Sequence, residues 1–135
     1  MIDVTCAIII WNGKILATLR ARGMHLEGHW EFPGGKIETG ETAEACISRE
    51  ILEELNIRIR VIRSMQPVEH HYPNKAIRLI PFVCEIVSGK IQLAEHSEFR
   101  WLDENEIHEM NWAAADRKVV EGLINMDVKD KNQEC

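Results

Sequence analysis

The sequence predicts an α+β sandwich, in which a mixed β-sheet lies between layers of helices. The first observation is the order of its segments: strand-like runs, one long helix-forming segment, more strand-like runs, and two helix-forming segments at the end. That order is typical of a sheet covered by helices. The second observation is size, because 135 residues with 45% hydrophobic residues suffice for one domain with one core. We expect that domain to span residues 1–128 and a frayed tail to cover residues 129–135.

A β-hairpin is the first predicted element. The run VTCAIIIW (residues 4–11) is short and β-branched, which favours a buried strand, and KILATLR (residues 14–20) alternates like a second strand. Asn12 and Gly13 stand between the two runs, and Asn-Gly in that place is the strongest short signal for a hairpin turn. A polar loop then leads to a turn at EFPGG, residues 31–35.

A helix is predicted over residues 41–55, which contain no Pro or Gly and are rich in helix formers. We expect the helix to start at Thr39 or the residue after it. We expect it to end at Asn56, because Asn readily adopts the left-handed conformation that closes a helix.

Further strands and two helices follow this helix. The segment IRIRVIRSM alternates like a strand with one solvent-exposed face, and AIRLIPFVCEIV is typical of a strand that is more fully buried. A turn at SGK leads to the short strand FRWLD. The two closing helices are predicted at residues 103–110 and 113–125.

The charge and the cysteines limit the possible functions. The formal net charge of −6 argues against a nucleic-acid-binding protein, which would need a basic surface. The N-terminus lacks the basic region of a signal peptide, and no apolar run reaches membrane-spanning length. No C-x-x-C pair or zinc-site spacing is present, and three of the cysteines lie within apolar runs, so we expect buried free thiols in a cytoplasmic protein. The four cysteines are Cys6, Cys46, Cys84 and Cys135.

Three acids gather on one side of the predicted helix. Glu50 lies three positions before Glu53 and four before Glu54, and like charges at those spacings destabilise a helix by about 0.2–0.5 kcal/mol each. They also lie in the C-terminal half of the helix, where its dipole disfavours anions. One interpretation is a solvated acidic face. The other is a divalent-metal site, since clustered carboxylates suit Mg²⁺ or Mn²⁺ and a bound cation would offset the repulsion.

The spacing of the whole segment resembles a known signature. Gly35 is followed after five residues by Glu41, and seven further residues precede Arg49. REILEELNI (residues 49–57) then places an aliphatic pair between Glu50 and the next two acids. This pattern resembles the Nudix box of the Nudix hydrolases, with Asn56 where the family usually has Gly. The segment WEFPGGKIE is similar to that of MutT-like 8-oxo-dGTP diphosphatases and CTP pyrophosphohydrolases.

The resemblance implies an α/β/α sandwich around a mixed sheet and a site for Mg²⁺, with Mn²⁺ as a substitute. It makes Glu50, Glu53 and Glu54 metal ligands, together with the carbonyl of Gly35. Arg49 would hold the carboxylates in place, and Glu41 would be structural. A later glutamate completes the metal site in MutT-type relatives; Glu95 is the match and Glu98 the reserve, with an ordinary surface loop as the alternative for both. Glu53 and Glu95 are the candidates for the general base.

Four residues are predicted to contact the substrate. Arg20, at the end of the second strand, would face the phosphates, with a solvated strand end as the alternative. Tyr72 and Phe82 could stack on a base, although core packing is the alternative for Phe82. Asp116, at the start of the last helix, would read the base edge; helix capping is its alternative. For the adjacent His70 and His71 we expect one buried and one solvated side chain.

The resemblance predicts a cytoplasmic, Mg²⁺-dependent enzyme that cleaves a nucleoside triphosphate into a nucleoside monophosphate and pyrophosphate. Oxidised guanine nucleotides and CTP-type nucleotides are the candidate substrates. Alternatives are a Nudix hydrolase of another nucleoside diphosphate derivative and a nucleotide-binding module without catalysis. We expect no nucleic acid or membrane partner, and a monomer or homodimer.

Overall fold

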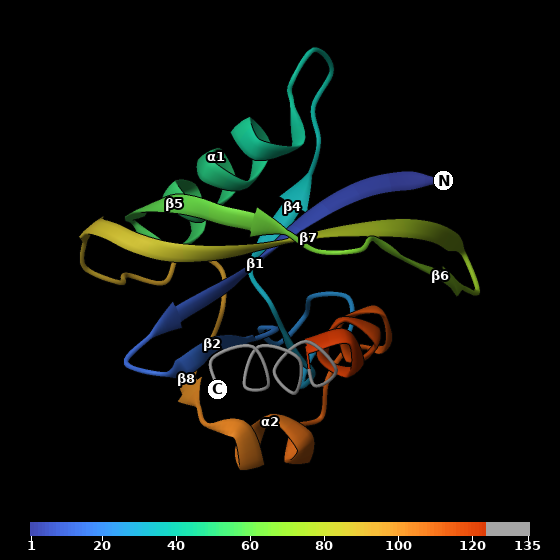
Figure 1. Cartoon of the computed structure of the whole chain (residues 1–135). Coiled ribbons are helices and arrows are strands. Elements are labelled where there is room, and N and C mark those ends of the chain that lie inside the picture. The colour runs from blue at the N-terminus through green and yellow to red at the C-terminus, as the bar shows by residue number, and fades with distance from the viewer. Residues whose placement is uncertain (124–135) are drawn as a thin grey trace, which may run out of the picture.

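The computed structural model of the chain describes residues 1–123 and contains a central mixed sheet (Figure 1). Strand β1 (Ile2–Trp11) is its central member. It runs parallel to β7 (Lys75–Gly89) along residues 2–9, and antiparallel to β4 (Gly34–Lys36) along residues 4–6. The end of β1 pairs antiparallel with β2 (Lys14–Leu19). The sheet therefore contains both parallel and antiparallel neighbours, as predicted.

The remaining strands extend the sheet on both sides of β1. Its main path runs in the order β3-β2-β1-β7-β5, with β8 paired to β2 and β6 paired to β7. The bounds of these strands are Trp30–Glu31 for β3, Ile57–Ser64 for β5, Val68–Tyr72 for β6 and Glu98–Leu102 for β8.

The first hairpin has the predicted turn. Trp11 pairs with Lys14, so Asn12 and Gly13 alone form the loop. Both have positive φ angles, 51° and 73°, as a two-residue turn of the favoured kind requires.

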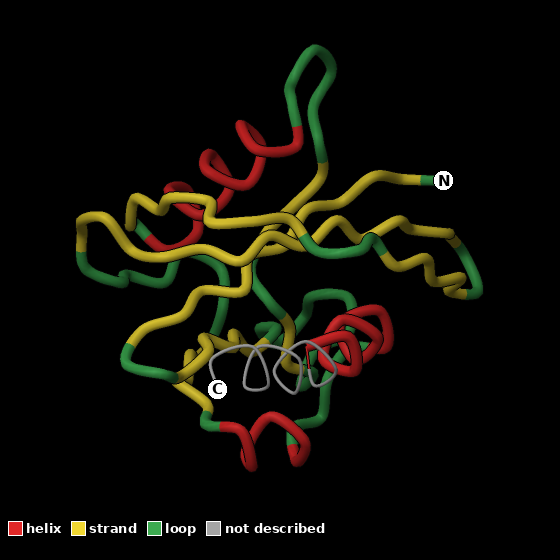
Figure 2. Tube along the Cα trace, viewed as in Figure 1, coloured by secondary structure: helices red, strands yellow, loops and turns green. Residues whose placement is uncertain are grey.

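Helices cover both faces of the sheet (Figures 1 and 2). Alternate residues of β1 serve different cores: Ala7 and Ile9 pack under α1 (Ala43–Leu55), whereas Cys6 and Ile8 pack against the helices on the other face. Those helices are α2 (Glu104–Glu109) and a helix whose described part spans residues 114–123. The predicted α/β/α sandwich is confirmed. The expected end of the last helix, at residue 125, lies outside the described residues.

The start of α1 differs from the prediction, and its end does not. Thr42, not Thr39, is the N-cap, and its side chain accepts a hydrogen bond from the backbone N–H of Ala45. Gly40 has a φ of 81°, so the chain is still in a turn at that point and cannot yet be helical. Asn56 has φ 60° and ψ 30°, the predicted left-handed end.

Three cysteines are buried free thiols, as expected: Cys6, Cys46 and Cys84. Cys135 and the predicted tail lie outside the described residues. Among residues 1–123, no helix is long and apolar enough to span a membrane.

Candidate active site

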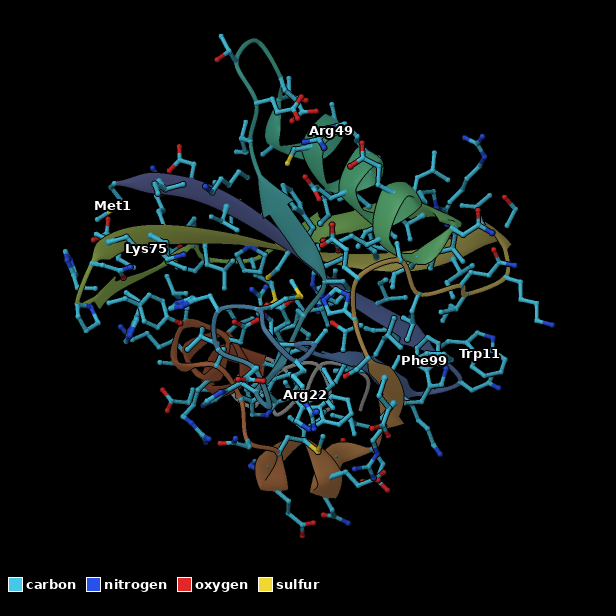
Figure 3. All side chains as sticks on the ribbon, turned by 180° about the vertical axis from the view of Figure 1, so that it is seen from behind. Met1, Trp11, Arg22, Arg49, Lys75 and Phe99 are labelled. Carbon is cyan, nitrogen blue, oxygen red and sulfur yellow. The ribbon has the colours of Figure 1, made fainter. Side chains whose placement is uncertain are left out.

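Arg49 organises the acids of α1. Its Nε and Nη2 donate to the two carboxylate oxygens of Glu41 at 2.7 and 3.0 Å, which is a bidentate pair. Its Nη1 donates to Glu50 at 2.9 Å and to Glu53 at 3.2 Å. The hydrogen bonds from Arg49 hold the pKa of Glu41 at about 2. Figure 3 shows Arg49 between α1 and the loop that leads into this helix.

Glu54 is the acid of the group that is buried. It is 8% exposed, and its Oε2 atom has no hydrogen-bond partner within the described chain. Burial raises the pKa of Glu54 to about 9, and the negative charges of Glu50, Glu31 and Glu95 raise it further. A buried carboxyl group that faces other acids is costly unless a cation compensates it.

Gly35 lies directly against Glu50. A Cβ atom on Gly35 would stand 2.3 Å from the carboxyl carbon of Glu50, so only glycine leaves the carboxylate its place. The carbonyl oxygen of Gly35 accepts hydrogen bonds from Thr5 Oγ1 at 3.2 Å and from Cys46 Sγ at 3.5 Å. Two buried side chains, one from β1 and one from α1, thus fix the orientation of this peptide group.

These residues fit a hard divalent cation. Among residues 1–123, no group of three or more His, Cys, Asp or Glu side chains is arranged to hold a metal ion. Arg49 bonds one oxygen each of Glu50 and Glu53. The unpartnered Oε2 of Glu54 and the all-oxygen donor set are nevertheless the features that Mg²⁺ or Mn²⁺ requires.

The loop of residues 90–97 brings Glu95 to these acids. The backbone N–H groups of Gln92 and Ala94 donate to the carbonyls of Leu55 and Glu54, both at 3.0 Å, so the loop is attached to the end of α1. The charge of Glu95 contributes to the raised pKa values of Glu50 and Glu54. Glu98, the reserve candidate, instead begins β8 and pairs with Leu19.

A cavity of about 240 Å³ adjoins the acids and collects three of the four predicted substrate residues, Arg20, Tyr72 and Asp116. Gly34 and Gly35 form part of its wall. Since these glycines also contact the acids of α1, the cavity and the acidic group share one boundary.

The carboxyl group of Asp116 has a hydrogen-bond partner from across the fold. Asp116 lies in the helix of residues 114–123, and its Oδ2 accepts a hydrogen bond from the backbone N–H of Phe32 at 2.9 Å. The side chain also accepts a hydrogen bond from its own backbone N–H in the first turn of this helix, so a contact of the capping kind and the contact with Phe32 coexist. Burial raises the pKa of Asp116 to about 8, and the charge of Glu31 adds to the effect. At neutral pH the carboxyl group is therefore mostly protonated.

The structure does not bring Phe82 to the cavity. Phe82 is 4% exposed and belongs to the core under α1, on the opposite face of the sheet from the cavity-lining Leu79. Core packing, the alternative interpretation, is the one that fits. The histidine expectation holds for the exposed His71, and His70 is half-buried with its ring 4.4 Å from that of Tyr72.

Two residues of the site escaped the sequence analysis, Glu31 and His96. Glu31 accepts hydrogen bonds from Arg20 Nη1, at 3.3 Å to each oxygen, and lines the cavity. The buried His96 ring lies 2.8 Å from Glu31. The only signals in the sequence were the place of Glu31 in WEFPGG and the place of His96 next to Glu95.

The comparison with protein families agrees with this geometry. A sequence model of the NUDIX domain matches residues 1–123. The chain belongs to the NUDIX domain family. Nudix hydrolases act on nucleotide pyrophosphate bonds. The predicted family and fold are therefore confirmed.

This protein is similar to curated relatives and to solved structures over most of its length. The chain is 32% identical to the CTP pyrophosphohydrolase of Escherichia coli K12 over 124 residues, which cover 92% of each protein. It is 34% identical to the E. coli 8-oxo-dGTP diphosphatase over 91 residues, which cover 67% of this chain and 70% of the relative. Its fold superposes on the MutT protein of Methanosarcina mazei Go1 with a TM-score of 0.84 at 26% identity, covering 96% and 95% of the two chains. For the E. coli ORF135 protein the TM-score is 0.82 at 30% identity, covering 94% and 91%.

Proposed function

We propose that this Nudix protein hydrolyses a nucleoside triphosphate to a nucleoside monophosphate and pyrophosphate, with Mg²⁺ or Mn²⁺ as the required cation. The observation that carries the proposal is the shared boundary between the buried acid Glu54 and the cavity that contains Asp116. A cation-bound phosphate chain fits the acidic end of such a site, and a nucleoside fits the cavity. The names of the two E. coli relatives support CTP-type nucleotides and oxidised guanine nucleotides as substrates.

The reaction is a hydrolysis at phosphorus. Water attacks a phosphorus atom of the substrate's triphosphate, and the P–O bond to the departing pyrophosphate breaks. A carboxylate of the protein accepts the proton of the water. Bound Mg²⁺ would neutralise phosphate oxygens and lower the pKa of the water. The proposed ligands are the carbonyl of Gly35 and the carboxylates of Glu50, Glu53, Glu54 and Glu95. Arg49 keeps two of these carboxylates in place.

Glu53 and Glu95 are the proposed bases, because both lie at the solvent-exposed side of the acidic group. Replacing Glu53→Gln should lower kcat by about a hundredfold or more. The free energy of unfolding should stay close to that of the wild type, since the lost ion pair with Arg49 is at the surface. Steady-state kinetics and urea unfolding test both statements. A variant with near-normal turnover would remove Glu53 from the chemistry and leave Glu95.

Three residues of the cavity are proposed to contact the phosphates and the base of the substrate. Arg20 supplies a positive charge for the phosphates next to an otherwise acidic group, and Tyr72 supplies a ring for stacking. Asp116 would bind the base edge through Oδ1, because Oδ2 already accepts the hydrogen bond from Phe32.

A nucleotide panel tests the proposal. The purified chain with Mg²⁺ is given CTP, dCTP, 8-oxo-dGTP, dGTP, ADP-ribose and a nucleotide sugar, and the products are separated by chromatography. Monophosphate and pyrophosphate from one of the triphosphates is the expected result. Exclusive cleavage of ADP-ribose or the sugar would support another Nudix activity, and no cleavage would support a binding module. We place the enzyme in the cytoplasm, where its three buried thiols remain reduced.

A further inference from the structure

We propose that His96 is a positioning residue, which holds the carboxylate of Glu31 at the wall of the cavity and the neighbouring Glu95 beside the acids of α1. This inference rests on the proposed function for its kinetic test and for the role of Arg20. It concerns a side chain that touches neither the cavity nor the acids of α1 directly.

The geometry of His96 is that of a buried donor. Its side chain is 1% exposed, and Nε2 lies 2.8 Å from Oε2 of Glu31. An ionised carboxylate can only accept, so Nε2 carries the shared hydrogen. The other ring nitrogen, Nδ1, is buried and has no hydrogen-bond partner in the described part of the chain. The contact with Glu31 is thus the polar interaction that determines how this ring is oriented.

The bond from His96 is shorter than the opposing contacts of Glu31. Arg20 approaches both oxygens of Glu31 at 3.3 Å from the cavity side, whereas His96 approaches one oxygen at 2.8 Å from the buried side. Arg20 must remain able to meet a phosphate, so it cannot also be the fixed support of this carboxylate. His96 can be, because packing immobilises its ring.

The position of Glu31 affects both ends of the site. Glu31 lines the cavity, and its charge contributes to the raised pKa values of Glu54 in the acidic group and of Asp116 in the cavity. A carboxylate that moved away from His96 would therefore change the electrostatics of the metal end and of the nucleoside end together.

His96 also anchors the loop that carries Glu95. Backbone hydrogen bonds attach this loop at Ala94, to Glu54, and at Ser97, to Leu19. Glu95 lies between these points, next to the only side chain of residues 95–97 that is buried. The bond between His96 and Glu31 adds an attachment of this loop at the residue adjacent to Glu95.

The kinetic test compares His96→Leu with His96→Gln. Leu fills a similar volume without a donor, whereas the amide of Gln can still donate to Glu31. We expect kcat/KM for the preferred nucleotide to fall about tenfold or more in His96→Leu and to recover largely in His96→Gln. The exposed His71→Leu is the matched control and should behave like the wild type. Circular dichroism and thermal unfolding establish that each variant is folded.

A double-mutant cycle separates positioning from general destabilisation. If His96 acts through Glu31, then His96→Leu should change kcat/KM less than twofold in a Glu31→Ala background, which has no acceptor for Nε2. Two independent effects would multiply instead, and that outcome would overturn the proposal. So would a folded His96→Gln that is no more active than His96→Leu.

An NMR measurement keeps the inference independent of the substrate. Long-range ¹H–¹⁵N spectra of the imidazole rings should show His96 protonated at Nε2, and Glu31→Ala should shift its Nε2 signal while leaving that of His71 unchanged. A ring protonated at Nδ1 alone, or insensitive to Glu31, would overturn the inference even in a fully active enzyme. If no nucleotide is cleaved but these spectra are as expected, the proposed function fails and the contact with Glu31 stands.

Discussion

Glu54 and Asp116 are two buried carboxyl groups at opposite ends of one site. Each keeps its proton at neutral pH because burial disfavours the charged form, and each also faces the charge of Glu31. The retained proton has a different consequence at each of the two groups. At Glu54 a cation can replace the proton, whereas at Asp116 the neutral carboxyl group would, in the proposed function, donate or accept a hydrogen bond at the base.

Glu54 should couple the binding of Mg²⁺ to the release of a proton. Its folded pKa of about 9 lies above the ordinary value of about 4.3. Between these values the folded chain holds a proton that the unfolded chain loses, so this group's contribution to stability falls as pH rises from about 4 to about 9. A metal ligand must be deprotonated, so Mg²⁺ should bind more tightly at higher pH.

Calorimetric titration of Mg²⁺ in two buffers of different ionisation enthalpy measures this proton. We expect close to one proton released by the wild type at pH 7, and markedly less by Glu54→Gln. Equal proton release by both proteins would place the titrating group elsewhere.

Asp116 should decide which base is preferred. With Oδ2 bonded to Phe32, the neutral carboxyl group can present either an acceptor or a donor to a base. In Asp116→Asn, if the amide oxygen keeps the Phe32 bond, only a donor remains for the base. A base that donates an N–H group to Asp116 would lose about 1.5 kcal/mol, whereas a base that accepts a hydrogen bond from it would not, so the ratio of kcat/KM between CTP and 8-oxo-dGTP should change about tenfold when the two bases use different contacts. An unchanged ratio would mean that Asp116 only supports Phe32.

At the scale of elements, features that depend on neighbouring residues could be predicted from the sequence, and features that depend on long-range packing could not. The first hairpin and the end of α1 depend on neighbouring residues such as Asn12 and Asn56, and both were predicted. Strand β6 was not predicted, because its sequence VEHHY is polar and it forms a strand through its pairing with β7. The face on which Phe82 lies depends on the register between β1 and β7, which no local signal specifies.

The same limit applies to the site. The acids of α1 could be predicted because they share one helix and one spacing. Glu31 and His96 are 65 positions apart, and only the folded chain brings them to 2.8 Å. Asp116 could be selected as a candidate from the sequence. The protonated state of its carboxyl group could not be predicted, since burial is a property of the folded core.

Two adjacent glycines of β4 should respond differently to the same change. A Cβ on Gly34 would stand 2.0 Å from the backbone oxygen of Thr5, which cannot move without breaking the pairing of β4 with β1. A Cβ on Gly35 would meet the carboxylate of Glu50, the far end of a flexible side chain. Gly34→Ala should therefore reduce the free energy of unfolding by about 3 kcal/mol or more. Gly35→Ala should remain folded and lose turnover.

Urea unfolding and steady-state kinetics on both variants test this contrast. An active Gly35→Ala would show that Glu50 can take another position, and a Gly34→Ala of normal stability would contradict the close approach of β4 to β1.

At the scale of the whole molecule, the site lies where the two halves of the fold meet. The acids belong to α1 on one face of the sheet, Asp116 belongs to a helix on the other face, and Glu31 on β3 interacts with both ends. The site thus joins elements that are far apart in the sequence. A ligand that bridges it should stabilise the entire domain rather than one segment.

Mg²⁺ alone should therefore raise the melting temperature, since a ligand that binds only the native state stabilises it by about 2.7 kcal/mol at a hundredfold excess over Kd. The double variant Glu50→Gln/Glu54→Gln should lose this response, because it removes two of the proposed ligands. Glu44→Gln, an exposed acid in the first turn of the same helix, is the matched control and should keep it. A non-hydrolysable triphosphate should raise the melting temperature further only when Mg²⁺ is present, because the acids repel the phosphates without it. A full response to Mg²⁺ in the double variant would place the cation away from α1 and would separate the nucleotide cavity from the acids that border it.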